Sequence, residues 1–397
     1  MTKTVAVIGA GIVGACIAYA LVKRGARVML IDRGEPGRGC SYGNLGAISE
    51  SSIAPLAMPG ILATLPSMLT DRDSPLSLSP RYLPRALPWL WRFLSSAKPE
   101  TVKANADKLH GLFQGACAAH AALAQEIGVP HLLLQNGHLF LYPDDAARAK
   151  DHATWTLRAS HGQRLENLDR AGIEHLEPGL PARYRSAVYI PDHATILDPY
   201  RYVQAVVRAF LARGGELLRA EVRNVSPSGG RWSLLTDGKP LQCDEAVIAA
   251  GAWAPGVLRT LGMKLRLESQ RGYHVQFPGR SSLISRTVVL ADKKVFLAPM
   301  VDGLRIGGTV EIAGLEALPS PHRAAILERL AREVFPDLAG VEGHHWMGHR
   351  PCMPDSVPVV GAAPGHAGLW LAVGHGHLGL TASVNTARRL ADALMPG

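Results

Sequence analysis

Three glycines near the start of the chain have the spacing of a phosphate-binding turn. Gly9, Gly11 and Gly14 follow the uncharged run TVAVI, and an apolar stretch continues to Lys23. Glycine allows a tight strand-to-helix turn at the first position, close approach of the backbone to a pyrophosphate at the second, and helix–strand packing at the third. The N-terminus of the following helix offers free N–H groups and partial positive charge to phosphates. The pattern predicts a dinucleotide site.

An acidic residue ends the next expected strand. Residues 27–31 read RVMLI and precede Asp32, whose carboxylate can accept hydrogen bonds from both hydroxyls of an adenosine ribose. This acid disfavours a ribose with a 2′-phosphate, so NADP is not expected. The fingerprint alone fits both FAD and NAD. The expected contacts of this first segment come from Gly9, Gly11, Ile12, Val13, Gly14, Asp32 and Arg33.

Two further segments resemble one known family. Residues 39–49 read GCSYGNLGAIS, and residues 348–355 read GHRPCMPD. Both are similar to segments of the D-amino-acid oxidase superfamily of FAD enzymes, and the second matches its G-x-R-P-x-x-P-D pattern. Within that superfamily the chain most resembles the bacterial D-amino-acid dehydrogenases, over nearly its whole length. FAD is therefore the expected cofactor, because an NAD-dependent Rossmann dehydrogenase has no need of the C-terminal block.

The resemblance implies which residues hold the flavin. In the family one segment runs under the isoalloxazine ring, a later strand contacts the adenine, and a strand-then-glycine element lies beside the adenosine. The N-terminus of the final helix points at the pyrimidine edge, where its dipole would stabilise the anionic reduced flavin. The corresponding residues are Ser41, Asn44, Leu45, Gly46, Ala47 and Ile48, then Val222, then Ala250, Gly251 and Trp253, and finally Gly376, His377, Leu378, Gly379, Leu380 and Thr381.

Arg350 is the first candidate for substrate binding. A guanidinium can bind a carboxylate through two parallel hydrogen bonds, and the family uses the arginine of this motif in that way. In an alternating stretch, Tyr273 could hydrogen bond the substrate carboxylate and Arg271 could add charge. Either could instead face solvent, because alternate residues of a strand point to opposite faces. His377 is interpreted as a pocket residue near the substrate amine, with a role as general base left open.

The elements that must position these residues indicate an α/β protein with an α+β second domain. We expect a Rossmann-like FAD-binding domain of the glutathione-reductase type, with an interleaved substrate-binding domain on a mostly antiparallel sheet. Strands of that sheet are predicted at residues 138–142, 187–190, 265–277 and 287–310. The FAD-binding domain is assigned residues 1–54, 195–262 and 338–397, and the substrate-binding domain residues 55–194 and 263–337.

Composition narrows the class of protein further. The 397 residues are 47% hydrophobic, which suits about two domains. The formal charge is +9, but lysine and arginine form no basic run of five, so we expect a basic solvated surface and no nucleic acid partner. The five cysteines contain no C-x-x-C pair, which argues against disulfides and a metal site. A cytoplasmic location is expected, with a peripheral position at the inner membrane as an alternative.

Hydrophobic segments raise the question of a membrane. The uncharged run over residues 5–22 contains the three glycines, so a strand–turn–helix explains it better than a signal peptide or anchor. Residues 55–98 are rich in proline and include PRALPWLWRFL. They are interpreted either as a helical cover over the active site or as a patch that docks on a membrane or an electron-accepting partner.

The resemblance implies oxidation of a D-amino acid to its imine, by hydride transfer from Cα to flavin N5. Electrons would pass to a respiratory acceptor, either a quinone or an electron-transfer partner. Residues 374–381 (GHGHLGLT) resemble the branch that acts on D-proline or cis-4-hydroxy-D-proline, so a cyclic imino acid is a candidate substrate. One alternative is an O2-using oxidase of glycine, sarcosine or another N-alkyl amino acid. Another is a flavin-binding protein without turnover, against which Arg350 and the complete fingerprint argue.

Overall fold

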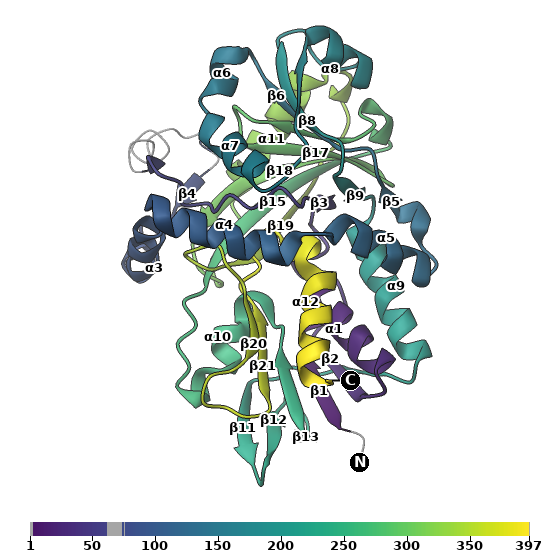
Figure 1. Cartoon of the computed structure of the whole chain (residues 1–397), viewed down its shortest axis with the longest axis vertical. Coiled ribbons are helices and arrows are strands. Elements are labelled where there is room, and N and C mark those ends of the chain that lie inside the picture. Colours follow the sequence, from purple (N-terminus) through teal and green to yellow (C-terminus); the bar gives the residue numbers. More distant parts are fainter. Residues whose placement is uncertain (1–2, 62–73, 75, 397) are drawn as a thin grey trace.

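Two units lie one above the other in the computed structural model, which describes residues 3–61, 74 and 76–396 (Figure 1). Part of the proline-rich segment, residues 62–73 and 75, therefore lies outside the described residues. The lower unit in the view contains both ends of the described chain, and the upper unit contains the larger sheet. The chain passes between them several times, as the interleaved arrangement predicts.

The lower unit is built on a six-stranded sheet whose strands are parallel except at one edge. In order across the sheet they are β10 (Glu216–Arg219), β2 (Arg27–Asp32), β1 (Thr4–Ile8), β14 (Glu245–Ile248), β21 (Leu369–Val373) and the antiparallel β20 (Val359–Ala362). The central strands are apolar along their length because both faces of the sheet are covered.

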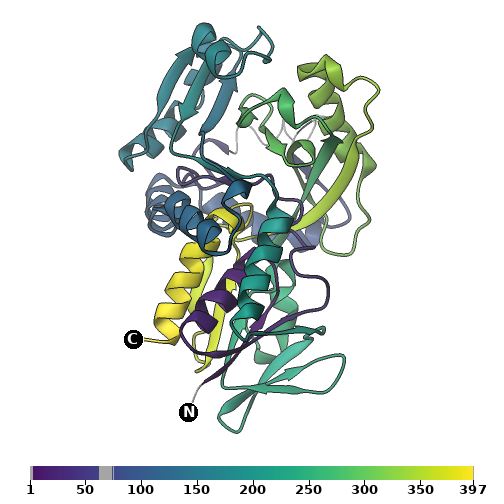
Figure 2. The same cartoon turned by 90° about the vertical axis from the view of Figure 1, so that its right-hand side faces the viewer.

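Helices cover one face of this sheet and a small sheet covers the other. Figure 2 shows α1 (Ile12–Lys23), α9 (Pro199–Ala212) and α12 (Gly379–Leu394) side by side. Their apolar residues form one core with the strands. The opposite face packs against a three-stranded sheet and a short helix, namely β11 (Asn224–Ser228), β12 (Arg231–Leu235), β13 (Leu241–Cys243) and α10 (Ala254–Val257). This is the expected Rossmann-like unit.

The upper unit is built on a nine-stranded, mostly antiparallel sheet, as predicted. Eight strands follow the order β19 (His344–Cys352), β15 (Glu268–Pro278), β18 (Gly303–Ile312), β17 (Val295–Met300), β16 (Thr287–Leu290), β6 (His138–Tyr142), β8 (Ser186–Ile190) and β7 (Glu166–Asp169). The ninth strand, β4 (Leu76–Leu78), pairs in parallel with β18. One face packs on α8 (Arg170–Leu176) and α11 (Pro321–Val334), while α6 (Asp145–Ala149) and α7 (His152–Ser160) contribute to a cluster on the other.

The sheets divide the chain differently from the expected domain boundaries at two places. Strand β19 pairs with β15 in the upper sheet, although residues 338–397 were assigned to the FAD-binding domain. Helix α5 (Ala116–Glu126) packs in the core of the lower unit, although residues 55–194 were assigned to the other domain. Between the units lie α3 (Leu83–Ser95), α4 (Pro99–Phe113) and a small sheet of β3 (Ala47–Ile48), β9 (Ala194–Ile196) and β5 (Leu133–Leu134).

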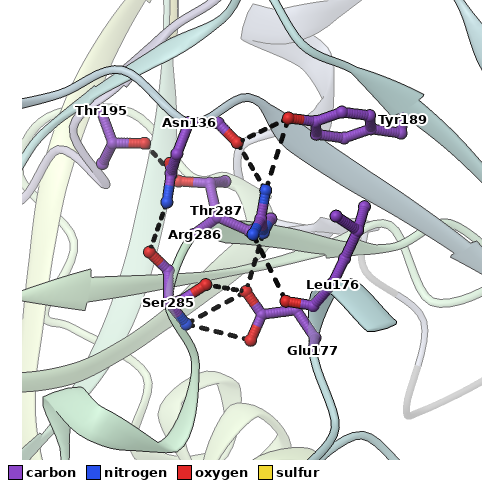
Figure 3. Close-up of polar contacts among 8 residues, drawn as sticks. All are labelled: Asn136, Leu176, Glu177, Tyr189, Thr195, Ser285, Arg286 and Thr287. Carbon is purple, nitrogen blue, oxygen red and sulfur yellow. Dashed lines mark hydrogen bonds and ion pairs between the residues drawn. The ribbon is translucent and has the colours of Figure 1, made fainter. Parts of the chain in front are cut away.

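A buried ion pair ties the end of α8 to the start of β16 (Figure 3). The Glu177 carboxylate is buried and accepts hydrogen bonds from Arg286 Nε at 2.9 Å and from Ser285 Oγ at 2.6 Å. The same guanidinium donates to the carbonyl oxygens of Asn136 and Leu176. Because every charged atom has a partner, the pair is compatible with burial.

Replacing Arg286 by methionine is expected to lower the free energy of unfolding by about 3 kcal/mol, because it leaves the Glu177 carboxylate buried without a cation. Urea unfolding followed by tryptophan fluorescence measures the change. The control is Arg164→Met, which removes an exposed ion pair with Glu166 and should cost less than about 1 kcal/mol. Equal losses in the two variants would contradict the assignment of Arg286 to a buried network.

Candidate active site

The glycine turn closes against the sheet as its spacing predicts. Gly9 has a φ of +108°, and a Cβ there would lie 2.4 Å from the carbonyl oxygen of Ala249. A Cβ on Gly14 would lie 1.8 Å from the carbonyl oxygen of Gly9. The Asp32 carboxylate accepts hydrogen bonds from the backbone N–H groups of Ala10 at 2.7 Å and Gly34 at 2.9 Å. These contacts hold the acid at the end of β2 beside the turn.

A cavity of about 740 Å³ runs from this turn toward the start of α12. Most of the residues predicted to hold the cofactor line it. They are Gly9, Gly11, Ile12, Val13, Asp32, Arg33, Ser41, Asn44, Val222, Ala250, Gly251, Trp253, Gly376, Gly379 and Leu380. The predicted residues outside its lining are Gly14, which packs behind the turn, and Leu45, Gly46, Ala47, Ile48, His377, Leu378 and Thr381.

One end of the cavity is walled by a stacked pair. The Arg33 guanidinium lies 4.3 Å from the ring centroid of Trp253, and its Nη1 is 3.7 Å from a carboxylate oxygen of Glu221. Val222 comes directly after Glu221 in the sequence. The sequence analysis placed Val222 in a strand, but it lies in the connection between β10 and β11. Its backbone is therefore not engaged in a strand ladder at this end of the cavity.

Two side chains of the upper sheet donate hydrogen bonds to carbonyl groups of the segment over residues 41–46. Arg305, on β18, donates hydrogen bonds to the carbonyl oxygens of Tyr42 at 3.1 Å and Asn44 at 2.6 Å. His274, on β15, donates from Nδ1 to the carbonyl oxygen of Gly43 at 3.1 Å. Three consecutive carbonyls are thus bound by two side chains that the sequence analysis did not identify.

Two glycines let this segment lie close to the rest of the protein. A Cβ on Gly43 would lie 1.9 Å from the ring of Trp346, which stacks on His274 with centroids 5.1 Å apart. Gly46 has a φ of +76°, and a Cβ there would meet the carbonyl oxygen of Ile196 at 2.0 Å. At the other side, the Ser41 hydroxyl accepts a hydrogen bond from Ile12 N–H at the start of α1.

The start of α12 is bonded to the same segment. The Thr381 hydroxyl donates to the carbonyl oxygen of Ala47 at 3.2 Å and accepts from Ser49 N–H at 3.1 Å. The buried His120 donates from Nε2 to the carbonyl oxygen of Leu380 at 2.9 Å. Helix α12 begins at Gly379, within the segment that the sequence predicts at its start, with its N-terminus at the cavity.

Arg350 lies on the face of the upper sheet that meets this segment. A Cβ on Gly272 would lie 2.3 Å from its guanidinium carbon, and its Nη1 donates to the carbonyl oxygen of Thr309 at 3.2 Å. Burial, and then the charge of Arg350, lower the pKa of His377 to about 4. The charge of Arg350 thus acts on His377. As a whole residue, His377 is exposed and does not line the cavity.

Arg271 and Tyr273 lie on the opposite face of β15. Directly opposed residues of antiparallel strands share a face. Arg271 is opposite His349 on the neighbouring strand, whereas Arg350 is opposite Gln270. The Tyr273 hydroxyl donates to Glu311 at 2.5 Å and accepts from Ser320 N–H, and Arg271 Nη1 lies 3.2 Å from the same carboxylate. The structure therefore does not bring these two side chains to Arg350.

Comparison with known proteins assigns the family. The model of the FAD dependent oxidoreductase family (DAO) matches residues 4–393. The chain belongs to this family. It is 38% identical over 400 residues to the D-amino-acid oxidase of Bradyrhizobium diazoefficiens, covering 99% of this chain and 95% of that protein. It is 33% identical over 414 residues to D-amino acid dehydrogenase 2 of Ralstonia nicotianae, covering 98% and 96%.

Solved structures of other proteins share the fold. The glycine oxidase of Bacillus cereus superimposes with a TM-score of 0.76 at 18% identity, covering 98% of this chain and 94% of that chain. The glycine oxidase of Geobacillus kaustophilus gives 0.75 at 23% identity, covering 99% and 95%. These likenesses establish the architecture of this DAO-family protein. The substrate has to be inferred from the site.

FAD is the cofactor of this oxidoreductase, and the cavity fits it. Gly9 lines its phosphate-binding turn and Gly14 backs it, and a Cβ at either position would strike backbone atoms. The acid at the end of β2 and the Arg33–Trp253 pair stand at one end, and the N-terminus of α12 stands at the other. These are the positions that a ribose, an adenine and the isoalloxazine ring require.

Over the described part of the chain, no helix is long and apolar enough to cross a bilayer. No group of three or more His, Cys, Asp or Glu is placed to hold a metal ion in that same part. All five cysteines are described and are free thiols.

Proposed function

We propose that this flavoenzyme oxidises a small D-amino acid, with Arg350 binding the substrate carboxylate. The observation that carries the proposal is the position of Arg350, which shares a face of β19 with Trp346 and so faces the segment over residues 41–46. A planar guanidinium can bind a carboxylate through two hydrogen bonds and so orient the Cα–H bond. Bound FAD supplies the hydride acceptor. The names of the two sequence relatives, an oxidase and a dehydrogenase of D-amino acids, support this reaction.

His377 supplies a neutral ring beside the substrate amine. Because burial and Arg350 hold its pKa near 4, the imidazole carries no charge at pH 7. A neutral ring does not repel the substrate ammonium and can accept a hydrogen bond from the amine. We assign His377 to orienting the amine.

The substrate is tested by anaerobic mixing of the holoenzyme with D- and L-amino acids while the flavin absorbance is followed. D-Proline and cis-4-hydroxy-D-proline are the first compounds, since the segment over residues 374–381 resembles the branch that acts on them. We expect a D-isomer to bleach the flavin and its L-isomer to leave it oxidised. Bleaching by glycine or sarcosine alone would favour the N-alkyl amino acid oxidase, and bleaching by none of them would favour a binding protein without turnover.

The electron acceptor is inferred to be a respiratory carrier, a quinone or an electron-transfer protein, and not O2. Relatives with both oxidase and dehydrogenase names occur at similar coverage, so the choice needs its own measurement. Stopped-flow mixing of the reduced enzyme with oxygen should give slow reoxidation, and a soluble quinone should give fast reoxidation. Fast reoxidation by oxygen would overturn the dehydrogenase assignment.

Helix α3 offers a docking surface for a membrane that holds such an acceptor. Its inner side is anchored next to Arg350, because Trp89 Nε1 donates to the carbonyl oxygen of Cys352 at 3.1 Å. Its outer side exposes Leu83, Leu87 and Trp91, which are 36%, 54% and 68% exposed and lie four residues apart. An apolar stripe of this kind enters the headgroup region of a bilayer.

The charges around this stripe favour an anionic lipid surface. Residues 74–99 contain no acidic residue and four basic ones, Arg81, Arg85, Arg92 and Lys98. Each basic residue near an anionic surface contributes about 1 kcal/mol of attraction. We therefore propose peripheral contact at the inner membrane through α3.

Exchanging Leu87 and Trp91 together for glutamate is expected to weaken binding to phosphatidylglycerol vesicles at least about tenfold, because apolar area is lost and the stripe becomes anionic. Co-sedimentation measures binding, with phosphatidylcholine vesicles as the uncharged comparison. The matched control exchanges two exposed leucines elsewhere, Leu211 and Leu318, for glutamate. Absence of wild-type binding, or equal binding by both double variants, would contradict the docking surface.

A further inference from the structure

Two buried histidines join the units outside the set of residues that the proposed reaction uses. His138 begins β6 in the upper sheet, and His193 directly precedes β9, which pairs with β3 beside the cavity. The side chains are 0% and 1% exposed, and their rings lie 4.7 Å apart. Their Nδ1 atoms are 3.1 Å apart, which is hydrogen-bond distance. One of the two must therefore donate to the other.

The backbone decides which nitrogen carries each proton. Ser51 N–H donates to His193 Nε2 at 3.2 Å, so that nitrogen must be an acceptor. The proton of a neutral His193 is then on Nδ1 and is donated to His138 Nδ1. His138 carries its own proton on Nε2 and donates it to the carbonyl oxygen of Ala194 at 2.9 Å. The hydrogen bonds therefore all run in one direction, as a chain from Ser51 N–H through both rings to the carbonyl oxygen of Ala194.

Both rings are held neutral, as this chain requires. Burial lowers the pKa of His138 to about 4. Burial, then His138 and Arg158, lower the pKa of His193 well below its usual value. A second proton on either ring would place two donors face to face at Nδ1 or at Ser51 N–H, so the charged forms are incompatible with the observed contacts.

These hydrogen bonds begin on the segment that follows strand β3, whose residues the sequence predicts to lie near the flavin. Ser49 N–H donates to the Thr381 hydroxyl, which itself donates to the carbonyl oxygen of Ala47. The backbone of Ser49 is therefore held from the α12 side, and that of Ser51 from the His193 side, where the Ser49 hydroxyl also lies 3.3 Å from His193 Nδ1. Together with the Glu50 carboxylate, which accepts from the backbone N–H groups of Gly115 and Cys117, these bonds fix the backbone after the two-residue strand β3.

We propose that His193 is a positioning residue of the flavin site, which holds Ser51 through its Nε2 and is itself oriented by His138. The hydrogen bond from Ser51 N–H holds the backbone in place. The hydrogen bond to His138 keeps the His193 proton on Nδ1, so that Nε2 is free to accept from Ser51. The inference rests on bound FAD and not on which amino acid is oxidised, so it stands or fails separately from the proposed substrate.

Two substitutions at position 193 separate the links. In His193→Gln the amide oxygen can take the place of Nε2 and accept from Ser51, whereas in His193→Asn the shorter amide reaches only toward His138. Each variant loses one buried hydrogen bond, so their melting temperatures should fall by similar amounts. The Asn variant should bind FAD about tenfold more weakly than the wild type, and the Gln variant within about twofold. FAD release is followed by flavin fluorescence without substrate, and His152→Asn and His152→Gln, at an exposed position, are the controls.

Equal FAD affinities for the Asn and Gln variants would overturn the proposal. A second measurement needs no variant: nitrogen-15 NMR of the wild-type holoenzyme at pH 7 reports the ring protons. We expect one neutral ring protonated on Nδ1 and one on Nε2 for this pair. A charged ring, or protons on the other nitrogens, would equally overturn the assigned chain.

Discussion

Replacing Arg350 by methionine is expected to lower kcat/KM for the amino acid about a thousandfold. A bidentate guanidinium–carboxylate pair contains two charge-assisted hydrogen bonds, each of about 1.5–3 kcal/mol, and about 4 kcal/mol corresponds to a thousandfold change. The substitution also leaves the carbonyl oxygen of Thr309 without its guanidinium donor. Steady-state kinetics with an artificial electron acceptor, together with the rate of anaerobic flavin reduction, measure the loss. FAD content should stay near that of the wild type, because Arg350 does not line the cavity.

Three companion variants make the test specific. Arg350→Lys keeps the charge but loses the planar fork, and should recover only part of the activity. Tyr273→Phe should lower the free energy of unfolding by about 1–2 kcal/mol and leave KM unchanged, because its hydroxyl binds Glu311 and Ser320 on the far face of β15. Arg266→Met removes an exposed arginine and serves as the control. A wild-type kcat/KM in Arg350→Met, or a large rise of KM in Tyr273→Phe, would contradict the placement of the carboxylate site.

The contrast between Arg350 and Tyr273 shows what alternation along a strand can predict. The pattern around residues 270–275 predicts a strand, and the strand is there as β15. Alternation separates its residues into two faces, but it does not say which face is shared with Arg350. That choice depends on β19, whose residues pair with those of β15 across 68 to 84 positions of the chain. The position of Tyr273 could therefore not be derived from its own neighbourhood.

The side chains that bind the segment over residues 41–46 were not predicted, for a related reason. Arg305 and His274 donate to carbonyl groups of residues 42–44, and a carbonyl acceptor has no signature in the sequence. The available signal was steric: Gly43 stands where a Cβ would strike Trp346, and Gly272 stands under Arg350. Glycines inside strands and loops indicate close approach, but only the fold identifies what approaches.

The dinucleotide turn was predictable because all of its parts are local. Strand, turn, helix and acid lie within residues 4–32, and each position has a steric or electrostatic requirement that few residue types meet. The domain boundary was less predictable because it depends on sheet pairing. β19 lies in a stretch of chain assigned to the lower unit but pairs in the upper sheet. α5 lies in a stretch assigned to the upper unit but packs in the core of the lower one. Interleaved domains separate sequence order from packing in this way.

Replacing Gly14 by alanine is expected to abolish stable FAD binding, with a loss of affinity of at least about a hundredfold. The new Cβ would lie 1.8 Å from the carbonyl oxygen of Gly9 and 3.3 Å from the Cβ of Ala249, so α1 would have to move away from β1. That movement displaces the N–H groups at the start of α1 from the phosphate position. It also disturbs the packing of α1 against α9 and α12, which overpacking data put at about 1–3 kcal/mol of unfolding free energy. The ratio of flavin to protein absorbance in the purified enzyme, and an FAD titration, measure the effect.

A second glycine within a helix supplies the matched control. Gly111 lies in α4, and a Cβ there would have only a nitrogen of Arg389 within 4 Å, at an ordinary contact distance of 3.7 Å. Gly111→Ala should keep its FAD and raise the free energy of unfolding by up to about 1 kcal/mol, since alanine favours the helix over glycine. The two variants make the same chemical change in a helix and differ in what the added methyl group meets. A Gly14→Ala enzyme that purifies with full flavin content would show that α1 can shift without loss of the phosphate site, and the steric account of the glycine turn would then be wrong.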